Sequence, residues 1–89
     1  MTRNEYDELF EQLCYGHEAE LLYNNKHYFL EWEKTKLVMY DITADCGKKV
    51  MEITGENRFS IVDKFCEFPV WDGQPLNKNY YNVEIIDIE

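Results

Sequence analysis

Between residues 18 and 54 the sequence is a succession of short strand-like runs separated by turns, and this pattern restricts the chain to a small antiparallel sheet. The runs alternate in polarity or are rich in aromatic and β-branched residues, and both patterns are typical of strands. Asn24 and Asn25 mark the first turn, because Asn tolerates positive φ. Each turn is short, as in hairpins between antiparallel neighbours. We therefore predict a four-stranded antiparallel meander formed by residues 18–23, 27–33, 37–43 and 49–54.

A helical repeat precedes the meander. Apolar residues recur every three or four positions over residues 3–15, which predicts a helix. Thr2 and Glu5 have the spacing of a capping box at its start, and Gly16 provides a left-handed stop at its end.

A second helical repeat follows the meander. It begins near Asn57 and ends before Pro69, because the residue that precedes a proline avoids the helical region. Residues 83–88 have the pattern of a final strand. We predict an α+β fold with an N-terminal helix, a four-stranded antiparallel meander, a second helix and a C-terminal strand, both helices lying on one face of the sheet. We expect residues 1–89 to form a single compact domain.

The aromatic residues exceed what one small core can hide. We expect Phe10, Leu13, Phe59 and Phe65 to belong to the core. The remaining tyrosines and tryptophans either border the core with their polar tips in water or anchor an interface, and the sequence leaves both readings open. These residues are Tyr15, Tyr23, Tyr28, Trp32, Tyr40, Trp71, Tyr80 and Tyr81.

The charge of the chain excludes several functions. It carries 18 Asp and Glu against 9 Lys and Arg, for a net charge of −9. Direct binding of nucleic acid needs clustered cations, so we predict none. A hydrophobic content of 45% is too high for a disordered acidic tail. The excess is concentrated in residues 1–45, which have 10 acids and 4 bases.

The cysteines and the hydropathy pattern predict a cytoplasmic protein. Cys14, Cys46 and Cys66 are odd in number and form no C-x-x-C pair, which argues against a disulfide framework and for a reducing compartment. The first residues lack the apolar segment of a secretory signal. The longest strictly apolar run is the four residues 37–40, so we expect no membrane partner.

No motif predicts catalysis or metal binding. Cys14 and His17 have the spacing of two zinc ligands, but no second pair completes the four ligands of a structural site. Cys46 lies in a predicted turn beside Lys48 and Lys49, so its reactivity stays open, although no orienting group or oxyanion donor can be named. We predict no enzyme activity, no cofactor and no metal.

Paired carboxylates are the most informative feature. Residues i and i+2 of a strand share a face, so Glu18 points with Glu20, and Glu31 points with Glu33. Pairing of the two strands through the Asn24 turn predicts a cluster of these four acids. The cluster is either a solvated strand face or a docking face for a basic protein. The predicted partner-binding residues are Glu8, Glu11, Glu18, Glu20, Tyr28, Glu31, Trp32 and Glu33.

The run GHEAELLYNNKHYFLE at residues 16–31 resembles the opening of small uncharacterised acidic proteins of low-GC Gram-positive bacteria and their mobile elements. The segments WDGQPL at residues 71–76 and VEIIDI at residues 83–88 are similar in style to the endings of such proteins. These motifs are structural, and the resemblance implies no activity. By size and charge alone, the chain also resembles phage anti-CRISPR inhibitors and the immunity proteins that neutralise nuclease toxins.

These observations predict a small acidic binding protein without catalysis. It would occlude a basic surface on a partner that handles nucleic acid, such as a nuclease, with carboxylates in the places of phosphates. The alternative is a housekeeping or regulatory domain of unknown role that associates with itself through strand edges. The sequence does not decide between a monomer and a homodimer.

Overall fold

The computed structural model describes residues 1–44 and 47–89, which form three α-helices, one short 3₁₀ helix and five strands. The elements in chain order are α1 (Arg3–Cys14), β1 (Ala19–Tyr23), β2 (Lys26–Glu33), β3 (Lys36–Asp41), β4 (Lys48–Ile53), α2 (Arg58–Glu67), α3 (Leu76–Asn79), the 3₁₀ helix (Tyr80–Asn82) and β5 (Glu84–Ile88).

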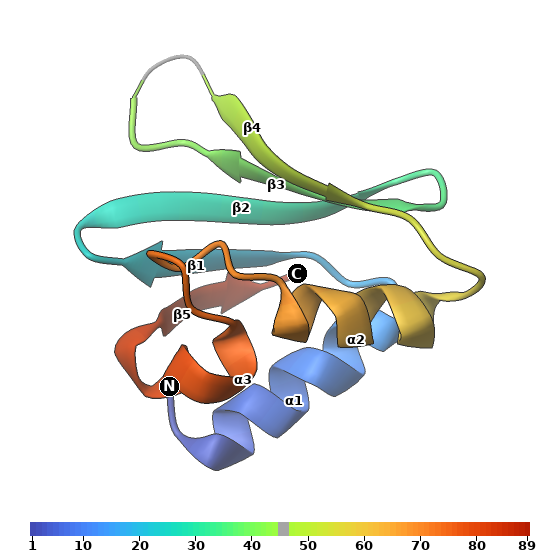
Figure 1. The fold of residues 1–89 in the computed structure, drawn as a ribbon, viewed down its shortest axis with the longest axis horizontal. Helices are drawn as coiled ribbons and strands as arrows, with labels where there is room; N and C mark the ends of the chain where they lie inside the picture. The colour runs from blue at the N-terminus through green and yellow to red at the C-terminus, as the bar shows by residue number, and fades with distance from the viewer. Residues whose placement is uncertain (45–46) are drawn as a thin grey trace.

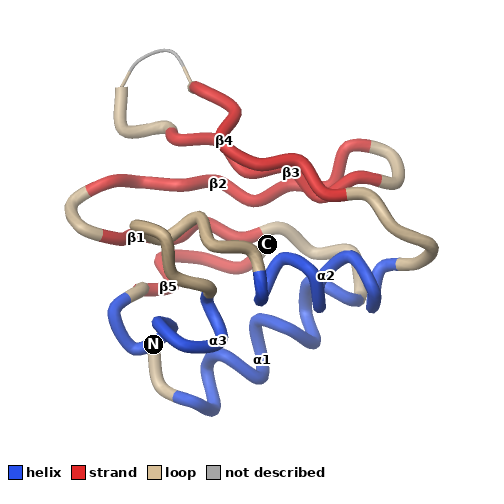
Figure 2. The backbone as a smooth tube through the Cα atoms, viewed as in Figure 1, coloured by secondary structure: helices blue, strands red, loops and turns tan. Residues whose placement is uncertain are grey.

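The strands form one antiparallel sheet in the order β4-β3-β2-β1-β5, and the helices lie together on one of its faces (Figures 1 and 2). The predicted α+β class is therefore confirmed. The predicted arrangement differs in detail, because β5 extends the sheet to five strands beside β1 and α3 is a further helix. Because β1 is the first strand after α1, its pairing with β5 places the C-terminal strand beside the N-terminal part of the chain.

Local capping chemistry sets the ends of the two longer helices. Thr2 and Glu5 form the predicted capping box of α1, and Gly16 follows that helix with a φ of 93°. Asn57 caps α2 through the backbone N–H of Ser60 at 2.8 Å. These side chains satisfy N–H groups that have no partner within the helix.

The first hairpin turn sets the register of the central strands. Asn24 and Asn25 have φ values of 52° and 63°, the left-handed geometry of a two-residue hairpin turn whose twist matches that of the strands. The register places Ala19 opposite Leu30. Because side chains alternate between the two faces of a sheet, this register decides which residues face the helices.

The core corrects two expectations from the sequence. Trp71 is only 1% exposed, and its ring packs edge-on against Tyr23 and Tyr28, with centroids 5.5 and 5.3 Å away. Phe59, expected in the core, is 63% exposed and contacts Phe10 at the surface of the helix layer. The segment after α2 therefore folds back and supplies the aromatic centre of the core, a long-range contact that a local pattern does not reveal.

We expect Trp71→Ala to lower the free energy of unfolding by about 3–5 kcal/mol, because it leaves a large cavity in the core. Trp71→Phe keeps an aromatic ring and removes an indole N–H that has no acceptor among the described residues, so it should cost less. Phe59→Ala is the matched control and should cost less than about 1 kcal/mol. Urea unfolding followed by far-ultraviolet circular dichroism measures all three, and a larger loss for Phe59→Ala than for Trp71→Ala would contradict this packing.

Candidate functional site

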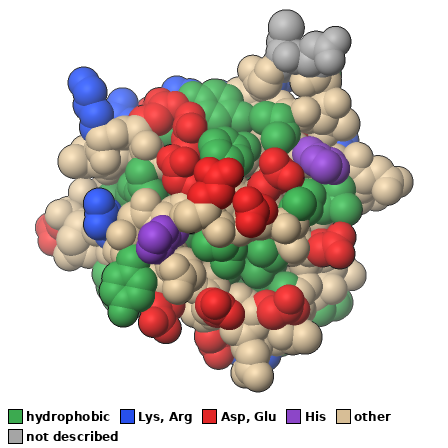
Figure 3. All heavy atoms as spheres, turned by 180° about the vertical axis from the view of Figure 1, so that it is seen from behind, with side chains coloured by type: hydrophobic (Ala, Val, Ile, Leu, Met, Phe, Trp, Pro, Cys, Tyr) green, Lys and Arg blue, Asp and Glu red, His purple; other side chains and the backbone are tan. Residues whose placement is uncertain are grey.

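The face of the sheet opposite the helices is the candidate site. Side chains at alternate positions of each strand point away from α1, α2 and α3, and none of the described elements covers them. Figure 3, seen from behind Figure 1, shows acidic side chains gathered near the middle of this side, with apolar side chains beside them. We call this surface the open face.

The fold brings together the four acids of the predicted hairpin cluster and adds a fifth. Glu20 of β1 lies directly opposite Asp87 of β5. Like charges directly opposite each other destabilise a sheet. We call the set the acidic face, and its members are Glu18, Glu20, Glu31, Glu33 and Asp87.

Glu31 and Glu33 share one face of β2, and their pKa values shift in opposite directions. Partial burial, the neighbouring carboxyl of Glu33 and the nearby charge of Glu18 raise the pKa of Glu31. The phenol of Tyr40 donates a hydrogen bond to Glu33, which lowers the pKa of Glu33. The same bond raises the pKa of Tyr40. Glu31 therefore holds a proton more readily than Glu33 does.

Glu18 continues the acidic face past the start of β1. One of its carboxylate oxygens accepts a hydrogen bond of 3.2 Å from the backbone N–H of Trp32. Its own backbone exchanges two hydrogen bonds with Glu89, at 2.8 and 3.3 Å, so the β1–β5 pairing extends to this position. Glu18 is thereby held beside Glu31.

Cations of the chain reach the acidic face at Glu33, which lies opposite Lys36. The hydrogen bond from Tyr40 lowers the pKa of Glu33, and the charges of Lys49 and Lys36 add to this effect. The ion pairs among residues 1–44 and 47–89 join Arg3 to Asp7, and join Lys36 and Lys49 to Glu52 at 3.8 and 3.1 Å. Glu52 also lies on the open face, opposite Val38, and its carboxylate is ion-paired with these two lysines. None of the three pairs includes a member of the acidic face.

Apolar side chains form a diagonal band beside these acids. Tyr40 lies opposite Phe29, Phe29 is a diagonal neighbour of Leu22, and Val38 precedes Tyr40 by two residues on the same face. Val38 is fully buried although it lies outside the helix-covered core, and the other three are half-buried. We call Leu22, Phe29, Val38 and Tyr40 the apolar band. The sequence analysis missed it, although the period-two alternation of β2 places Phe29 on the same face as Glu31.

Two predicted aromatic anchors lie on the opposite face. Tyr28 is buried against Trp71 and is not available to a partner without rearrangement. Trp32 is half-buried over the core, and its indole N–H donates to the backbone carbonyl of Leu13 at 3.1 Å. The correction has a simple cause: residues 28 and 32 alternate with 31 and 33, so they cannot share a face with those acids.

Two predicted acids also lie elsewhere. Glu8 and Glu11 are exposed on the outer side of α1, away from the Leu9 side that packs on the core. Since α1 lies on the other face of the sheet, these two carboxylates do not join the acidic face (Figure 1). A flat partner that covers the open face does not reach them.

The cysteines and histidines form no site within the described residues. Cys14 and Cys66 are free thiols, and burial raises the pKa of both, that of Cys66 to about 11. His17 hydrogen-bonds the carbonyl of Glu89 at 2.8 Å. Across residues 1–44 and 47–89, no group of three His, Cys, Asp or Glu side chains could hold a metal ion. Cys46, whose reactivity the sequence left open, lies outside the described residues.

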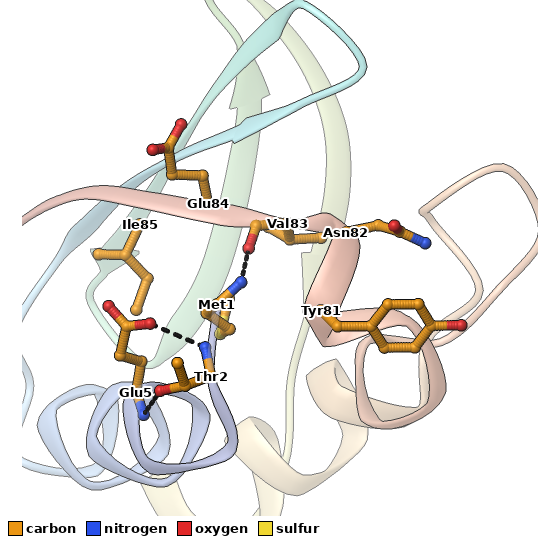
Figure 4. Close-up of a pocket in the computed structure, with 8 residues that line it drawn as sticks. All are labelled: Met1, Thr2, Glu5, Tyr81, Asn82, Val83, Glu84 and Ile85. Carbon is orange, nitrogen blue, oxygen red and sulfur yellow. Dashed lines mark hydrogen bonds between the residues drawn. The ribbon is translucent and has the colours of Figure 1, made fainter.

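A cavity of about 450 Å³ lies where the N-terminus meets the start of β5 (Figure 4). Hydrogen bonds within the fold already engage several of its polar groups. Thr2 and Glu5 bond each other in the capping box, and the amine of Met1 donates to the carbonyl of Val83. Tyr81 points away from that cluster. These contacts tie α1 to β5, and we assign this cavity a structural role.

Comparisons of the chain with protein-family models, with curated proteins and with solved structures found no match. Among the described residues, the helices are too short or too polar to cross a membrane. The functional argument therefore depends on the geometry of the open face.

We expect Glu31→Gln to stabilise the protein at pH 7, raising the thermal midpoint by about 2 °C, because it removes a carboxylate held beside other carboxylates. The pKa of Glu31 is raised in the folded state, so its ionisation opposes folding above its ordinary value of 4.5. The gain should shrink as the pH falls below that value, where Glu31 is protonated in both states. Thermal melts of the variant and of Glu8→Gln, an exposed control on α1, at pH 7 and pH 3.5 test this, and an equal gain for both variants would contradict it.

Proposed function

We propose that this protein is a small, acidic, non-catalytic binding protein of the cytoplasm whose acidic face occludes a basic surface of a nucleic-acid-handling partner. One observation carries the proposal: five carboxylates lie together on an uncovered sheet face, and the ion pairs of the described residues include none of them, although Lys36 lies opposite Glu33. The function is of the kind performed by phage anti-CRISPR inhibitors and by nuclease immunity proteins.

The mechanism is electrostatic and steric. A protein that binds nucleic acid presents Lys and Arg to phosphates. Carboxylates fixed on a rigid sheet can meet the same cations, and complementary charge speeds the encounter. Cations from the partner also remove the repulsion within the acidic face, such as that between Glu20 and Asp87, so the free energy of this repulsion is recovered on binding.

Features of the edge strands favour this function over self-association. An exposed edge is protected by charge and by irregular pairing. Lys48 and Lys49 lie on β4, and the pairing of β4 with β3 is irregular next to Tyr40. The pairing of β5 with β1 is irregular after Glu20. Both edges therefore oppose the extension of the sheet by a second copy.

A charge-removal experiment compares two triple variants in which Gln replaces Glu. Glu18→Gln, Glu31→Gln and Glu33→Gln together remove three charges from the acidic face, whereas Glu8→Gln, Glu11→Gln and Glu67→Gln remove three exposed charges from the helices. The immobilised protein is used to capture a partner from a bacterial lysate, and the partner is identified and purified. We expect a basic nucleic-acid-binding protein that loses affinity for the acidic-face variant by about tenfold or more and binds the helix variant normally.

Two further measurements complete this experiment. The partner should be released near ~0.5 M salt, since exposed charges are screened there. When a fluorescent DNA or RNA oligonucleotide is bound to the purified partner, addition of the protein should displace it. A partner that binds both triple variants equally, or that keeps its oligonucleotide, would reject the proposal.

A further inference from the structure

The open face combines the apolar band with the acidic face. Together these two surfaces indicate the shape of the partner segment as well as its charge. Resting on the proposed function, we infer that the partner segment seated on the open face is an amphipathic basic helix. Its apolar stripe covers the three half-buried members of the apolar band, Leu22, Phe29 and Tyr40, and a row of Lys or Arg along one side of that stripe meets the acidic face.

The backbone of the sheet favours a helix as the occupant. The central strands β1, β2 and β3 are each paired on both sides, so their N–H and C=O groups are occupied by ladder hydrogen bonds. An extended peptide gains no backbone pairing on such a face, and only side chains can dock there. A helix presents its apolar side chains as one stripe, which suits a narrow band that crosses three strands.

The position of the charges specifies which side of the helix is basic. Glu31 follows Phe29 by two residues on β2, and Glu20 lies opposite Phe29 on β1. The acids therefore line one long side of the apolar band. The other side has His27 near the hairpin turn and Lys49 of β4, which lies opposite Tyr40.

The state of the carboxyl pair agrees with this arrangement. The pKa of Glu31 is raised by burial, by the neighbouring carboxyl of Glu33 and by the charge of Glu18, and Glu33 accepts a hydrogen bond from Tyr40 of the apolar band. A cation placed beside Glu31 would stabilise its ionised form. Lys36 lies opposite Glu33 and Lys49 lies opposite Tyr40, both ion-paired with Glu52, whereas the residue opposite Glu31 on β3 is Val38.

Three labelled peptides of about 18 residues test the inference by fluorescence anisotropy in ~50 mM salt, where charge interactions are weakly screened. The first has a Leu stripe at helical spacing with Lys along one side of it, the second has the same composition in scrambled order, and the third carries the same number of Lys among Ser and Gly. We expect the amphipathic peptide to bind about tenfold more tightly than either of the others.

A matched pair of protein variants locates the contact. Phe29→Thr removes the centre of the apolar band while keeping strand propensity, and Phe59→Thr removes an exposed phenylalanine from the helix layer. We expect Phe29→Thr to weaken the amphipathic peptide about tenfold and Phe59→Thr to change its affinity less than twofold. Circular dichroism verifies folding, and Leu22→Thr replaces Phe29→Thr if that variant unfolds.

The outcomes separate this inference from the function on which it rests. If the Lys-Ser-Gly peptide binds as tightly as the amphipathic one, and if only the acidic-face triple variant weakens both, the helix is wrong while the occlusion of a basic surface stands. If no cationic peptide binds, both are rejected. If sedimentation shows a dimer that Phe29→Thr dissociates, the open face is covered by a second copy and the inference is overturned.

Discussion

A sheet covered on one face only buries every second residue of its central strands, and this constraint organises the whole molecule. In β2, Tyr28 and Leu30 point under the helices, whereas Phe29 and Glu31 point away from them. A shift of one residue in register would place Glu31 in the core and Leu30 in water. The burial of the core thus fixes the position of the acidic face, since both are set by the same backbone.

The C-terminal end of α1 connects the helix layer to the strand that carries the acids. The indole of Trp32 donates to the carbonyl of Leu13, and Arg58 donates to the carbonyl of Tyr15 at 3.4 Å. The Leu13 carbonyl also accepts the backbone N–H of Gly16 at 2.9 Å, so the indole is its second donor, and the guanidinium of Arg58 lies at the negative end of the helix dipole. Arg58 approaches Gly16 so closely that a Cβ there would lie 2.9 Å from its guanidinium carbon. Gly16 is favoured by its positive φ, whereas the flexible end of Arg58 could move away from a Cβ at little cost.

The local parts of the fold could be predicted from the sequence because local chemistry determines them. The capping box of Thr2, the turn at Asn24 and the end of α2 before Pro69 each depend on residues a few positions apart. The placement of β5 beside β1 and the burial of Trp71 depend on contacts between distant segments, and no local pattern encodes them. Either contact could have been proposed only by asking what covers the remaining apolar surface.

The candidate site was predictable to the same extent and for the same reason. Glu18, Glu20, Glu31 and Glu33 were placed together by one hairpin with a short turn. Asp87 was missed because its position opposite Glu20 requires the long-range pairing of β5. Tyr28 and Trp32 were grouped with acids that the alternation of β2 places on the other face, so that error could have been avoided from the sequence alone.

The repulsion between Glu20 and Asp87 argues most directly that the open face has a role beyond folding. A sequence selected for stability alone would set opposite or neutral charges across a pair of strands. The chain does so where Lys36 lies opposite Glu33 and where Lys49 meets Glu52, but not between Glu20 and Asp87. Local departures from otherwise consistent design are expected at functional sites, where stability is lost to maintain a binding surface. The position of this departure, beside an apolar band on an uncovered face, is where a basic partner would recover the lost free energy.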